Sequence, residues 1–163
     1  MEILTYPDPF LSTKAEDVTG FNEELRNTAD GMLEQMYLYQ GIGLASMQVG
    51  IPDKLFVFDV SPEKKDPVIM INPRITEKSA VRDPFEEGCL SVPGICEKIM
   101  RPGEVHVVWQ DIDGTEHEQD FGGIEARVIQ HELDHLNGVL FIDRLGQLKK
   151  ILLKKKLRAL ERK

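Results

Sequence analysis

Two histidines, His131 and His135, stand four residues apart with Glu132 between them, giving the pattern His-Glu-x-x-His. Apolar residues recur at helical spacing from Ile124 onward, and Gly138 stands where a helix would end in the left-handed conformation. Positions four apart lie on one face of a helix, so both imidazoles can bind one metal ion. Glu132 lies beside that ion, where a general base is needed. The pattern therefore predicts a catalytic metal site.

Such a site needs a third protein ligand, and the sequence offers it upstream of the histidines. No histidine follows His135, and the only later carboxylates are Asp143 and Glu161. Cysteine is the best match to two imidazoles around a borderline-soft divalent ion, and Cys89 is the favoured candidate. Besides several carboxylates, three other upstream residues are candidates: Cys96, His106 and His117. The two upstream histidines alternate within predicted strands, which favours a place on a sheet surface.

The composition is that of an ordinary soluble protein, with 163 residues, 41% of them hydrophobic and 29% charged. We expect one catalytic domain over residues 1–163. No apolar run approaches the roughly 20 residues of a membrane helix, and no signal peptide is visible at the N-terminus. Two cysteines without a secretory signal indicate a reducing compartment. We therefore expect a cytoplasmic protein with neither a membrane nor DNA as a partner.

Charge is distributed unevenly along the chain. Residues 144–163 carry nine Lys or Arg and one acid, Glu161, although the whole chain has a formal net charge of −8. A basic tail on an acidic body indicates a contact specific to the tail, and ribosomal RNA is one candidate partner. The favoured alternative is an amphipathic helix whose basic face is solvated and whose apolar residues dock on the body: Leu145, Leu148, Ile151 and Leu152.

Helices are predicted early and late in the chain, with strands between them. Asn22 is the predicted N-cap of a helix that runs to about Tyr39. Strands are predicted at residues 55–60, 68–72, 105–111 and 115–121, with Asp113-Gly114 as a type I′ turn between the last two. The stretches 41–48 and 85–94 are interpreted as connections. This order predicts an α+β fold, with antiparallel or mixed sheets around the His-Glu-x-x-His helix and with an N-terminal and a C-terminal helix.

Three stretches together resemble the motifs of the peptide deformylase family, in the family's order and at its separations. They are Gly41-Ile42-Gly43-Leu44-Ala45-Ser46-Met47-Gln48, Glu87-Gly88-Cys89-Leu90-Ser91 and His131-Glu132-Leu133-Asp134-His135. The resemblance covers nearly the whole chain. It implies a hydrolase that removes the N-formyl group from the initiator methionine of newly synthesised proteins and releases formate.

The resemblance also implies a role for each matching residue. Cys89, His131 and His135 bind one divalent ion, physiologically Fe²⁺, for which Zn²⁺, Ni²⁺ or Co²⁺ can substitute. Glu132 is the general acid/base. Gln48 and the Leu90 backbone N–H stabilise the oxyanion. The substrate is an N-formylmethionyl nascent chain, so the basic tail could contact the ribosome in a deformylase as well.

Several residues are expected to line the substrate site. The resemblance places Gly43 and Gly88 beside the substrate chain. Ile124 and Val128 share the helical stripe of His131, and with Ile42 they could form an apolar slot for the methionine side chain. Plain core packing is the alternative role for these three residues.

Two departures from the family pattern stand out. Ser46 replaces a second alanine, which is a small change. Cys96 stands where many bacterial relatives carry arginine on the substrate-binding face, so peptide affinity and preference are open. Two other classes of function also fit the residues, namely a different metal-dependent amide hydrolase or a non-catalytic binding protein that uses the basic tail.

Overall fold

The computed structural model describes residues 1–160, so the end of the predicted basic tail, residues 161–163, lies outside the described residues. Three α-helices are α1 (Glu23–Leu38), α2 (Gly123–Leu136) and α3 (Gln147–Leu160). Short 3-10 helices are η1 (Pro9–Ser12), η2 (Ser46–Val49) and η3 (Phe141–Arg144). Within residues 1–160, no helix is both long enough and apolar enough to cross a membrane.

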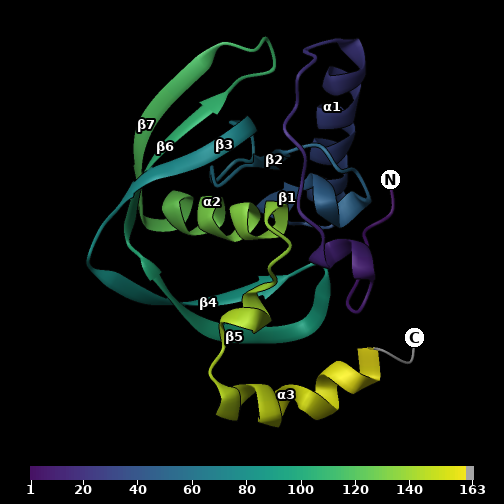
Figure 1. Ribbon diagram of the computed structural model, residues 1–163, viewed down its shortest axis with the longest axis vertical. Coiled ribbons are helices and arrows are strands. Elements are labelled where there is room, and N and C mark those ends of the chain that lie inside the picture. Colours follow the sequence, from purple (N-terminus) through teal and green to yellow (C-terminus); the bar gives the residue numbers. More distant parts are fainter. Residues whose placement is uncertain (161–163) are drawn as a thin grey trace.

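The strands form two antiparallel sheets. The larger sheet has the order β1-β2-β3-β6-β7, with β1 (Gly43–Ala45), β2 (Leu55–Phe58), β3 (Val68–Lys78), β6 (Glu104–Gln110) and β7 (Glu116–Gly122). The remaining strands, β4 (Arg82–Cys89) and β5 (Val92–Pro102), form a separate hairpin. Helix α2 runs between the larger sheet and this hairpin, and α3 lies beyond β5 (Figure 1). The predicted α+β class with a central helix is confirmed.

One apolar cluster holds α2 against the larger sheet, and another joins the hairpin to the C-terminal segment. On one side, Ala126 and Ile129 belong to a core with Phe56, Phe58 and Met70 of the larger sheet. On the other side, a second cluster joins the hairpin to η3 and α3 through four buried residues, Val92, Ile95, Phe141 and Leu153. Burial of such side chains stabilises the fold by about 1.5–3 kcal/mol each.

The predicted start of α1 and the predicted end of α2 both have capping hydrogen bonds. The Asn22 side chain accepts a hydrogen bond from the Leu25 N–H at 3.0 Å, as expected of an N-cap. Helix α2 ends with Gly138 in the left-handed conformation at φ +70. The Gly138 N–H donates to the His135 carbonyl at 3.0 Å and the Val139 N–H to the Asp134 carbonyl at 2.9 Å, which is a Schellman motif. The predicted helix end at Gly138 is confirmed.

Two predicted strands differ in length from the observed ones. Strand β2 ends at Phe58, two residues before the predicted Val60. Strand β3 continues to Lys78 through Pro73, beyond the predicted end at Asn72. The register of β3 against β6 shifts between Ile71 and Arg74, so the proline occupies an irregular position where it removes no ladder hydrogen bond.

The turn between β6 and β7 is not the predicted type I′ turn. A type I′ turn requires a positive φ at both central residues, but Asp113 is not among the described residues with a positive φ, whereas Gly114 has φ +83. The Gly114 N–H donates to the Asp111 carbonyl at 3.0 Å, and the Asp111 N–H donates to the Thr115 carbonyl at 2.9 Å. This longer loop with a left-handed glycine closes the hairpin because the Asp111 side chain also accepts from the Asp113 and Thr115 N–H groups.

The connection predicted at residues 85–94 is instead the end of β4, a two-residue turn at Leu90–Ser91 and the start of β5. The pattern was misleading because β4 contains Pro84, Gly88 and four charged residues, which are unfavourable in isolated strands. Pairing with the longer β5 overrides that local preference.

The predicted docking face of the basic tail is wrong for three of its four apolar residues. Leu145 is buried, but Leu148, Ile151 and Leu152 are 72%, 66% and 71% exposed. Leu153 is buried instead, and Leu157 and Leu160 pack beside it. These three residues lie on the opposite side of α3, so the helix contacts the body through a different stripe of the same periodic pattern.

Candidate metal centre

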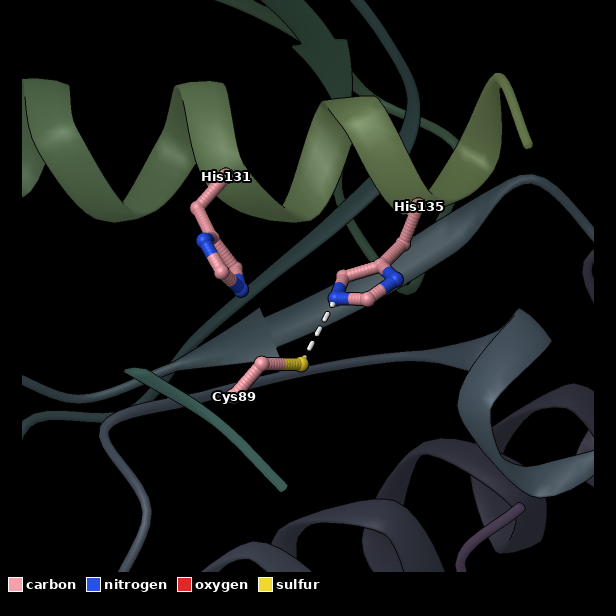
Figure 2. Close-up of side chains that lie close together, drawn as sticks. All are labelled: Cys89, His131 and His135. Atoms are coloured by element: carbon pink, nitrogen blue, oxygen red, sulfur yellow. Dashed lines mark hydrogen bonds between the residues drawn. The ribbon is translucent and has the colours of Figure 1, made fainter. Parts of the chain in front are cut away.

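Three side chains with metal-binding atoms meet between α2 and the hairpin. His131 and His135 project from successive turns of α2, and Cys89 comes from the end of β4 (Figure 2). Their ligand atoms lie within 4.8 Å of one another, and Cys89 Sγ is 3.2 Å from His135 Nε2. Among residues 1–160, none of Cys96, His106 and His117 belongs to such a group. The choice of third ligand left open by the sequence thus narrows to Cys89.

The chemistry of this donor set fits a divalent ion. One thiolate and two imidazoles suit a borderline-soft metal and leave a coordination position for substrate. Burial lowers the pKa of His135 well below its ordinary value, and the nearby charge of His131 lowers it further. The His135 imidazole is therefore neutral and has a free lone pair. Its Nδ1 has no hydrogen-bond partner among the described residues, whereas Nε2 faces the sulfur of Cys89.

His131 has a different environment. Its Nδ1 lies 3.0 Å from Glu87 Oε2. Burial would lower the pKa of His131, but hydrogen bonds to Cys89 and Glu87 and the nearby charge of Glu132 raise it to about 10. A cation at this centre would compete with the proton on this imidazole. Carboxylate support of this kind is typical of metal-binding histidines.

Glu132 is held in a buried place that changes its acidity. The residue is 4% exposed, and burial raises the pKa of Glu132 to about 7 against the lowering effect of His131. Its Oε2 has no hydrogen-bond partner among the described residues. A carboxyl group with a pKa near neutrality can accept and return a proton.

Gly43 allows the carboxyl group of Glu132 to lie against the backbone of β1. A Cβ at this glycine would meet Glu132 Oε1, and it would also lie 2.9 Å from Val128 Cγ1. The close approach fixes the side of the cleft on which Glu132 lies. This is a packing reason for the glycine that does not involve substrate.

Gln48 and Leu90 flank Cys89. Gln48 Oε1 accepts a hydrogen bond from the Ala45 N–H at 2.9 Å, so the Nε2 amino group must face the opposite way. Nε2 donates to Ser91 Oγ at 3.1 Å and lies 3.4 Å from Cys89 Sγ. Leu90 is in the two-residue turn that follows Cys89. Both residues line the cleft described next.

A cleft of about 740 Å³ opens over this centre. Its lining includes Cys89, His131 and Glu132 together with all five residues predicted to contact substrate, Ile42, Gly43, Gly88, Ile124 and Val128. Ile42 and Ile124 are 42% and 38% exposed, which suits a wall that receives an apolar ligand. Val128 also belongs to the core around α2, so the packing role considered from the sequence applies to it. Cys96 is exposed in the same cleft.

Sequence reasoning missed the buried charges that surround the centre. Glu87 begins the second family motif, but the sequence predicts no role for it, nor for Arg101, Arg127 or Asp134, all of which are buried. A signal existed for two of them, because Arg127 and Asp134 lie four residues before and three after His131 and so share its helical face. Arg101 had no local signal, since only the pairing of β4 with β5 brings it to Glu87.

Comparisons with known proteins agree with this geometry. A family model described as polypeptide deformylase matches residues 1–151. The peptide deformylase of Maricaulis maris is 46% identical over 151 residues, which cover 91% of this chain and 87% of that protein. The peptide deformylase of Acidobacterium capsulatum is also 46% identical, with coverage of 98% and 95%.

Solved structures give the same result. Peptide deformylase from Plasmodium falciparum superposes with a TM-score of 0.94 at 42% identity, over 99% of this chain and 95% of that one. Peptide deformylase 1B from Arabidopsis thaliana superposes with a TM-score of 0.94 at 40% identity, over 99% and 91%. The chain therefore belongs to the peptide deformylase family, whose enzymes remove the N-formyl group from nascent peptides.

Proposed function

We propose that this chain hydrolyses the formyl amide of N-formylmethionyl nascent chains at the Cys89, His131 and His135 centre. The observation that carries the proposal is the convergence of these ligand atoms within 4.8 Å at a cleft that Glu132 also lines. Residues 1–163 act as one catalytic domain, whose basic C-terminal segment contains α3 (Gln147–Leu160).

Cys89, His131 and His135 would hold one divalent ion. When bound, the ion supplies Lewis acidity that activates water near neutral pH and polarises a carbonyl group. The physiological ion is Fe²⁺, an assignment that rests on the family resemblance, and Zn²⁺, Ni²⁺ or Co²⁺ can replace it. The mixed sulfur and nitrogen donors are compatible with all four ions.

Glu132 moves the proton. Its carboxylate accepts a proton from the attacking water and transfers it to the nitrogen of the leaving methionine amine, which frees formate. Two properties support this role: Oε2 has no partner among the described residues, and burial raises the pKa of Glu132 to about 7. A free oxygen and a near-neutral pKa allow both proton transfers at one atom.

Gln48 and the Leu90 N–H stabilise the negative charge that develops on the formyl oxygen. The Ala45 N–H holds the Gln48 carbonyl, which supports an amino group already oriented toward Cys89 before substrate binds. A donor that needs no reorganisation is worth about 10²–10³ in rate.

The methionine side chain occupies the apolar slot formed by Ile42, Ile124 and Val128. Gly43 and Gly88 lie beside the substrate backbone. A side chain at Gly43 would displace Glu132 or Val128. A Cβ at Gly88 would meet Cys96 Sγ at 3.0 Å. The presence of all five residues in one cleft lining supports this assignment.

The location of the enzyme and its contact with the ribosome are part of the same proposal. The enzyme acts in the cytoplasm on chains leaving the ribosome, and α3 contacts the ribosome. The exposed apolar residues Leu148, Ile151 and Leu152, which lie among lysines of α3, support a partner for this helix. The test is co-sedimentation with ribosomes, which truncation after Leu145 should abolish.

Formate release from a formyl-Met-Ala-Ser peptide tests the main proposal. Protein purified anaerobically with its metal quantified should release formate, and removal of the metal by a chelator should stop the reaction. Faster cleavage of an internal peptide bond would instead support a different amide hydrolase. Metal-loaded, folded protein without turnover would support a binding role and contradict the proposal.

A further inference from the structure

A network of hydrogen-bonded charged side chains, most of them buried, leads from the candidate metal centre to the end of η3. Its members are Glu87, Arg101, Asp134 and Arg144, with Arg127 at one side. The side chains of Arg101 and Glu87 are 3% and 4% exposed, and that of Asp134 is 11% exposed. Arg144 is the member that reaches solvent, with 41% of its side chain exposed.

The inner part of this network, Arg101 and Glu87, fixes the orientation of His131. Arg101 donates two parallel hydrogen bonds to Glu87, from Nε to Oε1 at 2.7 Å and from Nη2 to Oε2 at 2.9 Å. Such a bidentate pair holds the carboxylate in the plane of the guanidinium group. Because Glu87 then acts as an acceptor, His131 must donate to it from Nδ1, which leaves Nε2 as the nitrogen that gives up its proton to bind a metal ion.

The outer part of the network, Asp134 and Arg144, holds Arg101 in place. Arg101 Nη1 donates to Asp134 Oδ2 at 2.8 Å, so its guanidinium is fixed between two carboxylates. Arg144 in turn donates from Nε and Nη2 to the two oxygens of Asp134. Arg144 is the last residue of η3, and therefore a side chain outside the cleft is linked to a ligand within it.

We propose that Asp134 and Arg144 are positioning residues for the metal centre, acting on His131 through Arg101 and Glu87. The inference rests on the proposed metal role of Cys89, His131 and His135. The two histidines differ in this respect, because His135 Nδ1 has no partner among the described residues. The two hydrogen bonds from Arg144 restrict the rotation of the Asp134 carboxylate. Asp134 in turn fixes the guanidinium of Arg101, which fixes Glu87. The His131 ring therefore keeps the orientation and the tautomer that a metal ion requires.

Cobalt(II) bound to the full-length protein provides a readout separate from activity. Absorption from the cysteine-to-cobalt bond and from the ligand field reports the geometry of the centre, and transfer to excess chelator reports the release rate. Arg144→Met is the test variant. Lys149→Met is its matched control, because Lys149 is 46% exposed, carries the same charge and pairs with Glu97 outside the network.

Arg144→Met should release cobalt about 10-fold faster than the native protein and should shift the ligand-field absorption, since loss of an outer partner costs about 10–100-fold in metal affinity. Lys149→Met should stay within about twofold of the native release rate, because exposed ion pairs contribute little. Arg144→Lys should recover part of the effect, as lysine restores the charge but not the bidentate pair.

Native release and absorption in Arg144→Met would overturn the inference, as would equal acceleration by Lys149→Met. If Arg144→Met does not fold, Arg144→Lys and Asp134→Asn decide by the same two readouts. The native protein separates this inference from the proposed function. If the native cobalt protein lacks a cysteine-to-cobalt absorption band, both the proposed function and the positioning role are overturned. If the native protein has this band but Arg144→Met changes neither the absorption nor the release rate, the positioning role alone is overturned.

Discussion

Helices α2 and α3 contain 14 residues each and are both amphipathic, yet they have opposite environments. Helix α2 buries most of its residues, including five polar ones: Arg127, Gln130, Glu132, Asp134 and His135. In α3, every residue of which is described, Leu153 alone is buried. The difference follows from what surrounds each helix, because α2 has sheets on two sides and α3 meets the body on one (Figure 1).

This contrast shows how polar groups can occupy the interior. Within α2, Arg127 is paired with Glu87 of the hairpin, and Asp134 is paired with Arg101 of the hairpin. Burial of a charge without such a partner would cost several kcal/mol. The lysines of α3 have no comparable constraint, since they remain in water. Substitutions in α2 should therefore have large and specific effects, and those in α3 should depend on which face they alter.

The largest expected effect is on catalysis, in Glu132→Gln. Loss of the proton acceptor should lower kcat by about 10²–10⁴-fold while the metal content stays constant. The control is Glu125→Gln, an acid in the first turn of α2 outside the cleft lining. A carboxylate accepts a proton only above its pKa, so native kcat/KM should fall as the pH drops below about 7. Equal activity of the two variants in a formate-release assay would contradict the role of Glu132.

The next largest effect is expected on stability, in Arg101→Met. This change leaves Glu87 and Asp134 buried without their shared partner and should lower the free energy of unfolding by about 3–5 kcal/mol. Arg26→Met is a suitable control, since Arg26 pairs with Asp113 at the surface and should cost at most about 1 kcal/mol. Urea unfolding followed by circular dichroism measures both values. Similar losses in the two variants would argue against the special position of the buried pair.

Neighbouring leucines of α3 offer a sharper comparison. Leu153 is 6% exposed and Leu152 is 71% exposed. Leu153→Ala should destabilise the protein by about 2–5 kcal/mol, because it removes buried methyl groups. Leu152→Ala should change stability by no more than about 0.5 kcal/mol. If thermal unfolding shows the reverse order, α3 docks through the stripe originally predicted from the sequence.

Gly43→Ala should have the smallest effect on stability in the region of α2. The added methyl group must displace Glu132 or Val128, which should cost about 1–3 kcal/mol and also reduce kcat. Gly146→Ala is the control, because a Cβ there meets no described atom within 4 Å. Thermal unfolding and formate release would measure the pair. An unchanged Gly43→Ala enzyme would mean that Glu132 can move without loss of function.

The sequence predicted local features best where one residue type at one spacing carries the information. The Asn22 cap, the helix end at Gly138 and the shared face of His131 and His135 are of this kind. The hairpin β4–β5 could not be predicted in the same way, because the partner of a charged residue such as Glu87 is Arg101 on the other strand.

Long-range contacts were also needed to place α3 and the third candidate ligand of the metal centre. Periodicity alone could not show which stripe of α3 faces the body, since two apolar stripes fit the helix. It also left the third ligand open among Cys89, Cys96 and the upstream histidines. Contacts between distant segments decide which stripe of α3 is buried and bring Cys89 to the two histidines. For Cys89, the resemblance to the family motifs had already favoured the same residue.

The most direct test of the central claim is the X-ray absorption spectrum of the metal in the loaded, full-length protein. We predict one sulfur and two imidazole nitrogens among the ligands, and loss of the sulfur contribution in Cys89→Ser. Cys96→Ser should leave the spectrum unchanged. A spectrum with only oxygen and nitrogen ligands in the native protein would contradict a centre built from Cys89, His131 and His135.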